Sequence, residues 1–198
     1  MAHFYRDNGQ NPPVWNGPDI FFESDKEIEA QTLIQNIGGR GNLELIVRYG
    51  VREKTKLIHF TGDTSEYLIR WSDPVDIPNT DTIKGDISLI QSLGDTQDFH
   101  MVAGYGGANT GTNWRGLAHF FTSNRDHTDW EGPNLFAEIV NPTTTRKISL
   151  IENLTRGPGN FELVALEDPG RESTHRLYYY THNQNAFPYS WQGPFTII

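Results

Sequence analysis

Short segments in which every second residue is hydrophobic recur along the chain. Leu43, Leu45 and Val47 lie on one side of an extended segment, and Phe161 and Leu163 repeat the pattern further on. An apolar residue at every second position is typical of a half-buried β-strand. Glycine and proline interrupt these segments, as in GGRGN, RGPGN and EDPGRES, and such residues favour turns. The pattern therefore predicts many short strands joined by turns.

The segments return in a fixed order. TLIQN, SLIQS and SLIEN begin at residues 32, 88 and 149, and NLELIV, DFHMVA and NFELVA begin at 42, 98 and 160. An L-x-H-F segment and a W-x-G-P segment follow. The last segment places a tryptophan at positions 15, 71, 130 and 191, so the copies step by 56, 59 and 61 residues. His3, His59, His119 and Tyr179 keep nearly the same spacing.

A repeat of 56 to 61 residues with four short strands predicts an all-β fold, a β-propeller built of four-stranded blades. We expect one repeat domain over residues 1–198, with about three and a half repeats: a half-unit at 2–23 and complete units at 30–80, 86–140 and 147–198. The segment ESDKEIEAQTL has helical composition, but its copies do not, so a strand is expected there too. Each unit is too small to bury its own faces. The repeated tryptophans are therefore expected to be mostly buried between neighbouring units.

Composition narrows the class of function. Hydrophobic residues make up 36% of the 198 residues and aromatic residues 12%, as in a folded chain. A net charge of -9 without a basic stripe disfavours nucleic-acid binding. No apolar run approaches the roughly 18 residues of a spanning helix, and the first residues lack the apolar core of a signal peptide. We expect no membrane insertion, and a protein that is cytoplasmic or released without a signal peptide.

Several residue types in the repeats are suited to binding a sugar. A tryptophan face matches the apolar C–H side of a sugar ring, although tryptophans at equivalent positions also fit a structural wedge. Polar residues in RDN at 6–8 and NRD at 124–126 can bind hydroxyl groups or close hairpin turns. Trp114 differs because it lies in a glycine-rich insertion without an aromatic counterpart in the other units. The candidate ligand-binding residues are Trp15, Trp71, Trp130, Trp191, Trp114, Arg6, Asp7, Asn8, Arg125, Asp126 and His119.

No catalytic residue is predicted from the repeats. Glu44 and Glu162 correspond to His100 in the second complete unit, so the carboxylate pair that a glycosidase needs does not recur. His127 and Asp129 in NRDHTDW form the most enzyme-like local cluster, but a solvated loop is the preferred interpretation. The chain contains no glycine-rich phosphate loop and no nucleophile elbow.

No metal or cofactor site is predicted either. The chain has no cysteine, which excludes disulfides, thiolate catalysis and cysteine-ligated zinc. His3, His59 and His119 belong to three different units, so structural or hydrogen-bonding roles are favoured over a shared metal ion.

The repeat architecture, together with the H-F, R-D-N and W-x-G-P segments, resembles the propeller lectins built from tandem aromatic-rich blades, such as the tachylectin-2-like and Photorhabdus-lectin-like groups. The resemblance extends over the whole chain. Repeated blades without a catalytic constellation favour a multivalent carbohydrate-binding protein, because linked weak sites raise avidity. Two alternatives remain open. One is a polysaccharide-active enzyme such as a lyase, with a histidine or tyrosine base in a cleft, and the other is a scaffold that binds protein partners.

The half-unit at 2–23 predicts self-association. It contains only the third and fourth segments of the repeat, and an isolated two-stranded hairpin is marginally stable at best. Two copies of the chain contribute seven units, which is within the usual number of propeller blades. We therefore expect a homodimer that closes one ring. Since both half-units carry the same two strands, an edge-to-edge dimer is the alternative.

Overall fold

The computed structural model describes residues 1–7, 12, 14–36, 42–51, 54–65, 69–93, 98–106, 115–122, 129–138, 145–167, 176–183 and 190–197. Within these residues the regular elements are β-strands and a single 3₁₀ helix, η2, at Leu154–Arg156. The prediction of an all-β fold is confirmed. Most of the segment of helical composition, residues 27–33, lies in strand β3 (Glu27–Gln35), so its position in the repeat indicated its structure better than its helix propensity did.

The strands form four antiparallel sheets in which neighbours follow chain order. The half-unit is a pair, and the first, second and third units each form a larger sheet. We use these names for the four groups of strands from here on. The half-unit contains β1 (Ala2–Asp7) and β2 (Val14–Ile20). The first unit contains β3, β4 (Leu43–Val51), β5 (Lys54–Asp63), β6 (Arg70–Trp71) and β7 (Val75–Ile77).

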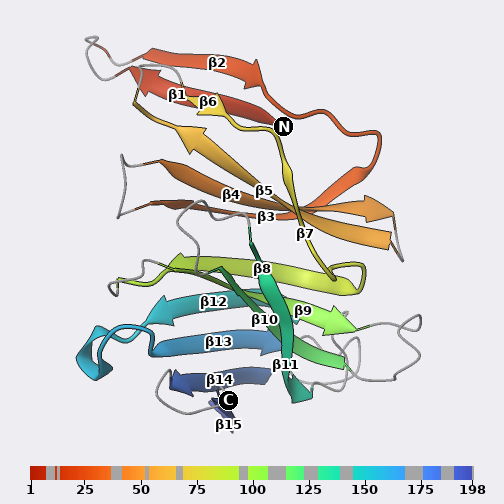
Figure 1. Cartoon of the computed structure of the whole chain (residues 1–198), viewed down its shortest axis with the longest axis vertical. Helices are drawn as coiled ribbons and strands as arrows, with labels where there is room; N and C mark the ends of the chain where they lie inside the picture. The colour runs from red at the N-terminus through yellow and green to blue at the C-terminus, as the bar shows by residue number, and fades with distance from the viewer. Residues whose placement is uncertain are drawn as a thin grey trace.

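The second and third units each have four strands. The second contains β8 (Ile83–Gln91), β9 (Phe99–Gly106), β10 (Arg115–Thr122) and β11 (Glu131–Glu138). The third contains β12 (Thr145–Glu152), β13 (Phe161–Glu167), β14 (Arg176–Asn183) and β15 (Ser190–Thr196). Figure 1 shows the sheets following one another along the long axis, with the half-unit at one end and the third unit at the other.

The first strands of neighbouring units are joined by side-chain hydrogen bonds. Gln91 Nε2 on β8 donates to Asn36 Oδ1, which follows β3, at 2.9 Å. The second and third units repeat this link, because Ser92 Oγ donates to Glu152 Oε1 at 2.8 Å. The backbone N–H of Leu150 on β12 also donates to Ser88 Oγ on β8. These bonds hold the inner strands of adjacent sheets side by side.

Glycine in the W-x-G-P segment lets the fourth strand pass close to the third. Gly132 has φ +127°, and a Cβ atom there would lie 2.9 Å from the carbonyl oxygen of His119. Gly17 and Gly193 make the equivalent close approach in the half-unit and the third unit. In the first unit Asp73 replaces this glycine, and the strand is divided into β6 and β7, which both pair with β5. The motif therefore recurs partly because the backbone requires it.

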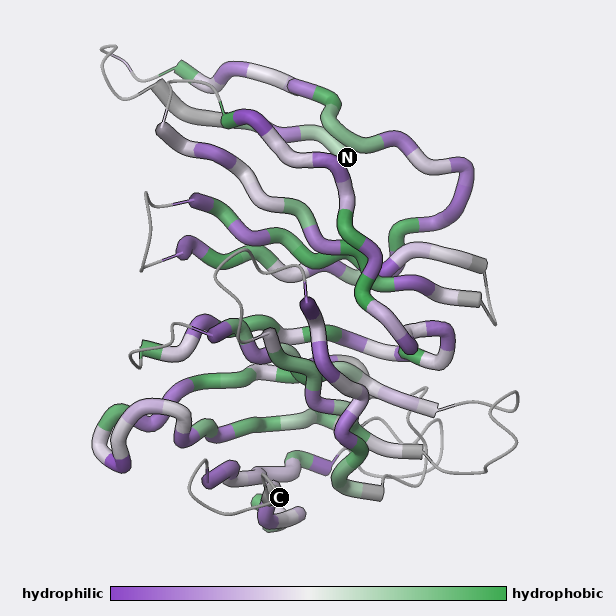
Figure 2. Tube along the Cα trace, in the orientation of Figure 1, coloured by the Kyte–Doolittle hydropathy of each residue, from purple (hydrophilic) through white to green (hydrophobic). Residues whose placement is uncertain are grey.

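Hydrophobic side chains are buried where one sheet faces the next. Ile46 and Leu57 of the first unit share a cluster with Leu89 and Phe120 of the second. A second cluster joins the second and third units, and a third contains residues of the first unit packed against the end of the half-unit. Figure 2 shows hydrophobic and hydrophilic residues alternating along many strands, as the sequence pattern predicts. We call each of these contacts between neighbouring sheets a junction.

Candidate binding site

Each junction places the tryptophan of one unit against a ring of the preceding unit. The rings meet edge to face, with interplanar angles between 79° and 90°. Edge-to-face contact is a preferred arrangement of aromatic rings. The three pairs and their centroid separations are His3–Trp71 at 6.3 Å, His59–Trp130 at 5.7 Å and His119–Trp191 at 5.7 Å. The spacing of the histidines in the sequence thus follows the spacing of the tryptophans.

A second residue of the preceding unit covers the tryptophan from another side. Phe21 stacks on Trp71 with centroids 4.7 Å apart, and Phe136 stacks on Trp191 at 4.5 Å. Ile77 has the corresponding position in the first unit and shares a buried cluster with Trp130. The preceding unit therefore encloses each tryptophan between a ring from its third strand and an apolar residue that comes six positions after its own tryptophan.

Buried polar pairs lie beneath these tryptophans. In the first unit His59 Nε2 lies 2.9 Å from Glu44 Oε2, and Glu44 also accepts hydrogen bonds from Asn36 and Thr61. The second unit has a pair at the same positions, with His100 Nδ1 3.0 Å from His119 Nε2. Because the hydrogen bonds of Glu44 come from neighbouring strands and both partners of its pair are buried, this network stabilises the sheet.

Three histidines gather between the second and third units. His119 stacks with His100 at 5.3 Å between ring centroids and meets His182 at 5.5 Å. Burial, with a smaller effect of His182, lowers the pKa of His100 to about 3. Burial is also the main cause of the lowered pKa values of His119 and His182. All three rings are therefore neutral at neutral pH.

The junction between the half-unit and the first unit contains a pocket of about 170 Å³. Phe21, Leu33 and Trp71 provide apolar walls, and His3 and Gln31 add polar groups. Leu33 is 55% exposed, whereas its counterpart Leu150 in the third unit is 6% exposed. The cause lies in the half-unit, since its two strands correspond to the third and fourth strands of a complete unit. In the part of the chain that the structure describes, the half-unit sheet has only these two strands, and they leave Leu33 largely uncovered.

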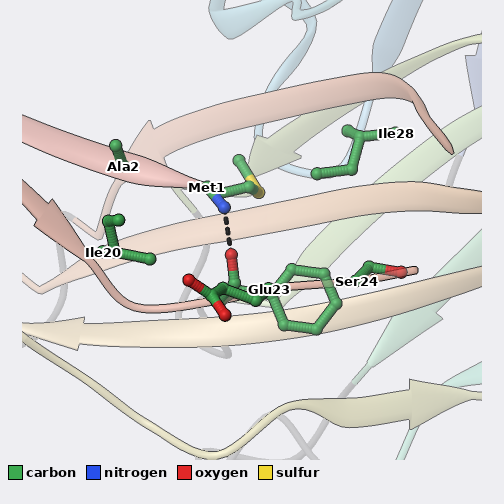
Figure 3. Close-up of a pocket in the computed structure, with 7 residues that line it drawn as sticks. Met1, Ala2, Ile20, Glu23, Ser24 and Ile28 are labelled. Carbon is green, nitrogen blue, oxygen red and sulfur yellow. Dashed lines mark hydrogen bonds between the residues drawn. The ribbon is translucent and has the colours of Figure 1, made fainter. Parts of the chain in front are cut away.

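A wider and more open hollow of about 480 Å³ lies beside this pocket. Met1, Ile20 and Ile28 line it with apolar atoms, and Glu23 and Ser24 line it with polar ones (Figure 3). The terminal amino group of Met1 donates a hydrogen bond to the backbone carbonyl of Phe22, which ties the start of β1 to the segment after β2. The hollow continues the apolar surface of the first junction.

The structure places the predicted tryptophans in different environments. Trp130 is buried, Trp71 and Trp191 are half-buried, and Trp15 is 66% exposed. The expectation that the repeated tryptophans are mostly buried between units therefore holds for Trp130 and partly for Trp71 and Trp191. It is wrong for Trp15. Trp71 is the one that lines the pocket of the first junction.

The structure describes some of the polar candidates. His119 is buried among rings, and Arg6 and Asp7 lie in β1. Asn8, Trp114, Arg125 and Asp126 lie outside the described residues, as does His127 of the enzyme-like cluster.

Sequence reasoning missed Phe21, Gln31 and Leu33 as pocket residues. Leu33 has the same repeat position as two buried leucines, so its side chain alone gives no signal. The exposure of Leu33 could have been predicted from the half-unit before it, because that unit contains only two of the four repeated segments.

Within the described parts of the chain, no group of three histidine, cysteine or acidic side chains is arranged to hold a metal ion. No helix in those parts is long and apolar enough to cross a membrane. No protein-family model matches the chain, and the curated proteins give no match either.

Proposed function

We propose that the chain is a carbohydrate-binding protein of the β-propeller lectin type, with a sugar site between its half-unit and its first unit. The pocket of the first junction carries the proposal. It combines three apolar walls with the polar side chains of His3 and Gln31, which is the usual composition of a small-ligand site. Its volume of about 170 Å³ is below the roughly 300–1,000 Å³ of pockets for drug-sized ligands, so it suits a single sugar ring.

The residues divide the recognition of a sugar between them. Phe21 covers one face of the Trp71 indole, and a Cβ atom at Gly62 would lie 3.2 Å from the indole's six-membered ring. Trp71 therefore contributes an apolar wall that its neighbours hold in place. The apolar side of the sugar lies against this wall and Leu33, and its hydroxyl groups face His3 and Gln31. These lining residues come from β1, from the segment after β2, from β3 and from β6, so the site depends on the folded junction.

Polysaccharide cleavage is a less favoured function because the candidate bases are poorly suited to proton abstraction. Glu44 and His59 are buried and bonded to each other. Partial burial and a hydrogen bond with Glu162 raise the pKa of Tyr179, which makes its phenolate harder to form. Incubation with a panel of polysaccharides should release no new reducing ends. Release that depends on Tyr179 would favour the enzyme.

A glycan array on the purified chain, followed by calorimetric titration of the strongest hit, tests the proposed function. Leu33→Trp should fill the pocket and weaken binding by about tenfold or more. Ile151→Trp is the matched control, because Ile151 also lies on the first strand of a unit and is 53% exposed, but does not line the pocket. The control should bind as the unchanged chain does. A silent array, or equal losses in both variants, would contradict the proposal.

A further inference from the structure

The two ends of the molecule expose the two halves of the junction that the chain makes internally. At the start, Trp15 is 66% exposed, whereas its counterparts Trp71, Trp130 and Trp191 each lie against a ring of the preceding unit. The half-unit therefore presents a tryptophan without the surface that encloses it elsewhere.

The third unit presents that enclosing surface without a tryptophan. Tyr179 on β14 has the repeat position of His119, the ring that contacts Trp191. Ile197 has the repeat position of Phe136, which stacks on Trp191, and it is 52% exposed. The backbone N–H of Ile197 bonds to the carbonyl of Leu177, so this segment continues alongside β14.

These two surfaces belong to opposite ends of the long axis, as Figure 1 shows for β2 and β15. The two surfaces are therefore apart in one copy. Two copies can bring them together, because residues at the same repeat positions already meet in this arrangement at the internal junctions.

We propose that a second copy of the chain docks head to tail, with Trp15 of one copy between Tyr179 and Ile197 of the other. The contact pairs the half-unit with a complete unit, so it differs from a symmetric dimer formed by two half-units. A head-to-tail contact is heterologous and either closes into a ring of copies or continues as an open chain. It does not depend on sugar binding, since it involves residues outside the pocket of the first junction.

Two variants that each disable one surface test the contact. Trp15→Asp places a charge on the half-unit, and Ile197→Asp places one on the third unit. Both side chains are more than half exposed, so neither change removes a core residue. Leu135→Asp is the matched control, because Leu135 is also exposed but lies on β11 of the second unit and belongs to neither end surface.

Light scattering at micromolar concentration gives the result. The unchanged chain and the Leu135→Asp control should scatter above the 22.5 kDa of one copy, and each end variant alone should scatter as a single copy. An equimolar mixture of the two end variants should form a species of two chains. It retains one intact contact, between the third unit of the Trp15→Asp chain and the half-unit of the Ile197→Asp chain.

Three results would overturn the proposal. The first is an unchanged chain that scatters as a single copy at these concentrations, because the end surfaces would then be left to another kind of partner. The second is self-association of either end variant alone, because a symmetric contact of half-units would survive Ile197→Asp. The third is a mixture that stays monomeric although the circular dichroism of both variants matches that of the unchanged chain.

Discussion

The first junction and the junction between the second and third units use the same aromatic packing but differ in their inner strands. Phe21 stacks on Trp71 and Phe136 stacks on Trp191 at nearly the same separation. Yet Leu33 is exposed in the first case, and Leu150 is buried in the second. The comparison indicates that the tryptophan contact holds sheets together, and that a pocket is present where the preceding sheet has two strands instead of four.

The largest expected difference in the free energy of unfolding is between replacing a covered tryptophan and replacing an uncovered one. Trp130→Ala should reduce the free energy of unfolding by about 3–5 kcal/mol, because Trp130 is 5% exposed and belongs to a core cluster. Trp15→Ala should change it by about 0.5 kcal/mol or less, as surface substitutions usually do. Urea denaturation measures both at a protein concentration low enough for the unchanged chain to be a single copy. Equal losses would show that the exposure of the two side chains does not reflect their contributions.

A smaller loss of stability is expected when Gly132 is replaced, the glycine of the W-x-G-P segment that the first unit lacks. Gly132→Ala should cost about 1–3 kcal/mol, because the new Cβ would lie too close to the backbone of β10 at a positive φ. Asp73→Ala changes the equivalent position of the first unit, where the strand is already divided. Its midpoint of thermal unfolding should stay near that of the unchanged chain. If both variants melt alike, close approach of the strands is not the reason for the glycine.

The histidine cluster should make the second and third units sensitive to acid. Between about pH 6.5 and pH 3 the unfolded chain binds more protons than the folded chain, because burial lowers the pKa of His100 to about 3 and those of His119 and His182 as well. This contribution to stability is complete above pH 6.5 and is lost as the pH falls toward 3.

Replacing His100 sharpens this comparison, since the first unit has Glu44 at the same repeat position. His100→Gln removes one of the three titrating rings while keeping a polar side chain. The free energy of unfolding, measured from pH 7 to pH 4 (about the window set by these pKa values), should fall less steeply in the variant. An unchanged slope would mean that this cluster does not control the acid sensitivity.

The repeated segments were sufficient to predict the strands and their order. Alternating residues such as Leu43, Leu45 and Val47 lie in strand β4, and most of the segment of helical composition lies in β3. In β4 the local pattern and the repeat position agree, so short-range information was enough, whereas in β3 the repeat position was needed to correct the helical composition. The half-buried Trp71 and buried Trp130 follow from the same repetition, because each has a unit before it.

The pocket and the histidine cluster were not predictable in the same way. Leu33, Leu89 and Leu150 are equivalent in sequence, and their exposure differs only because of the sheet that precedes each one. His119 and His182 come from different units and meet only when the sheets face each other. Both features depend on contacts between distant segments, which the local pattern does not describe.

The central claim is that the first junction binds a sugar while the closed junctions serve packing. The indole N–H signals of the five tryptophans in a ¹H–¹⁵N spectrum test it directly during titration with a sugar that the array identifies. The account predicts that the Trp71 signal shifts and saturates, while the signals of buried Trp130 and of Trp191 stay in place. Binding that leaves the Trp71 signal unchanged, or that moves the Trp191 signal instead, would contradict it.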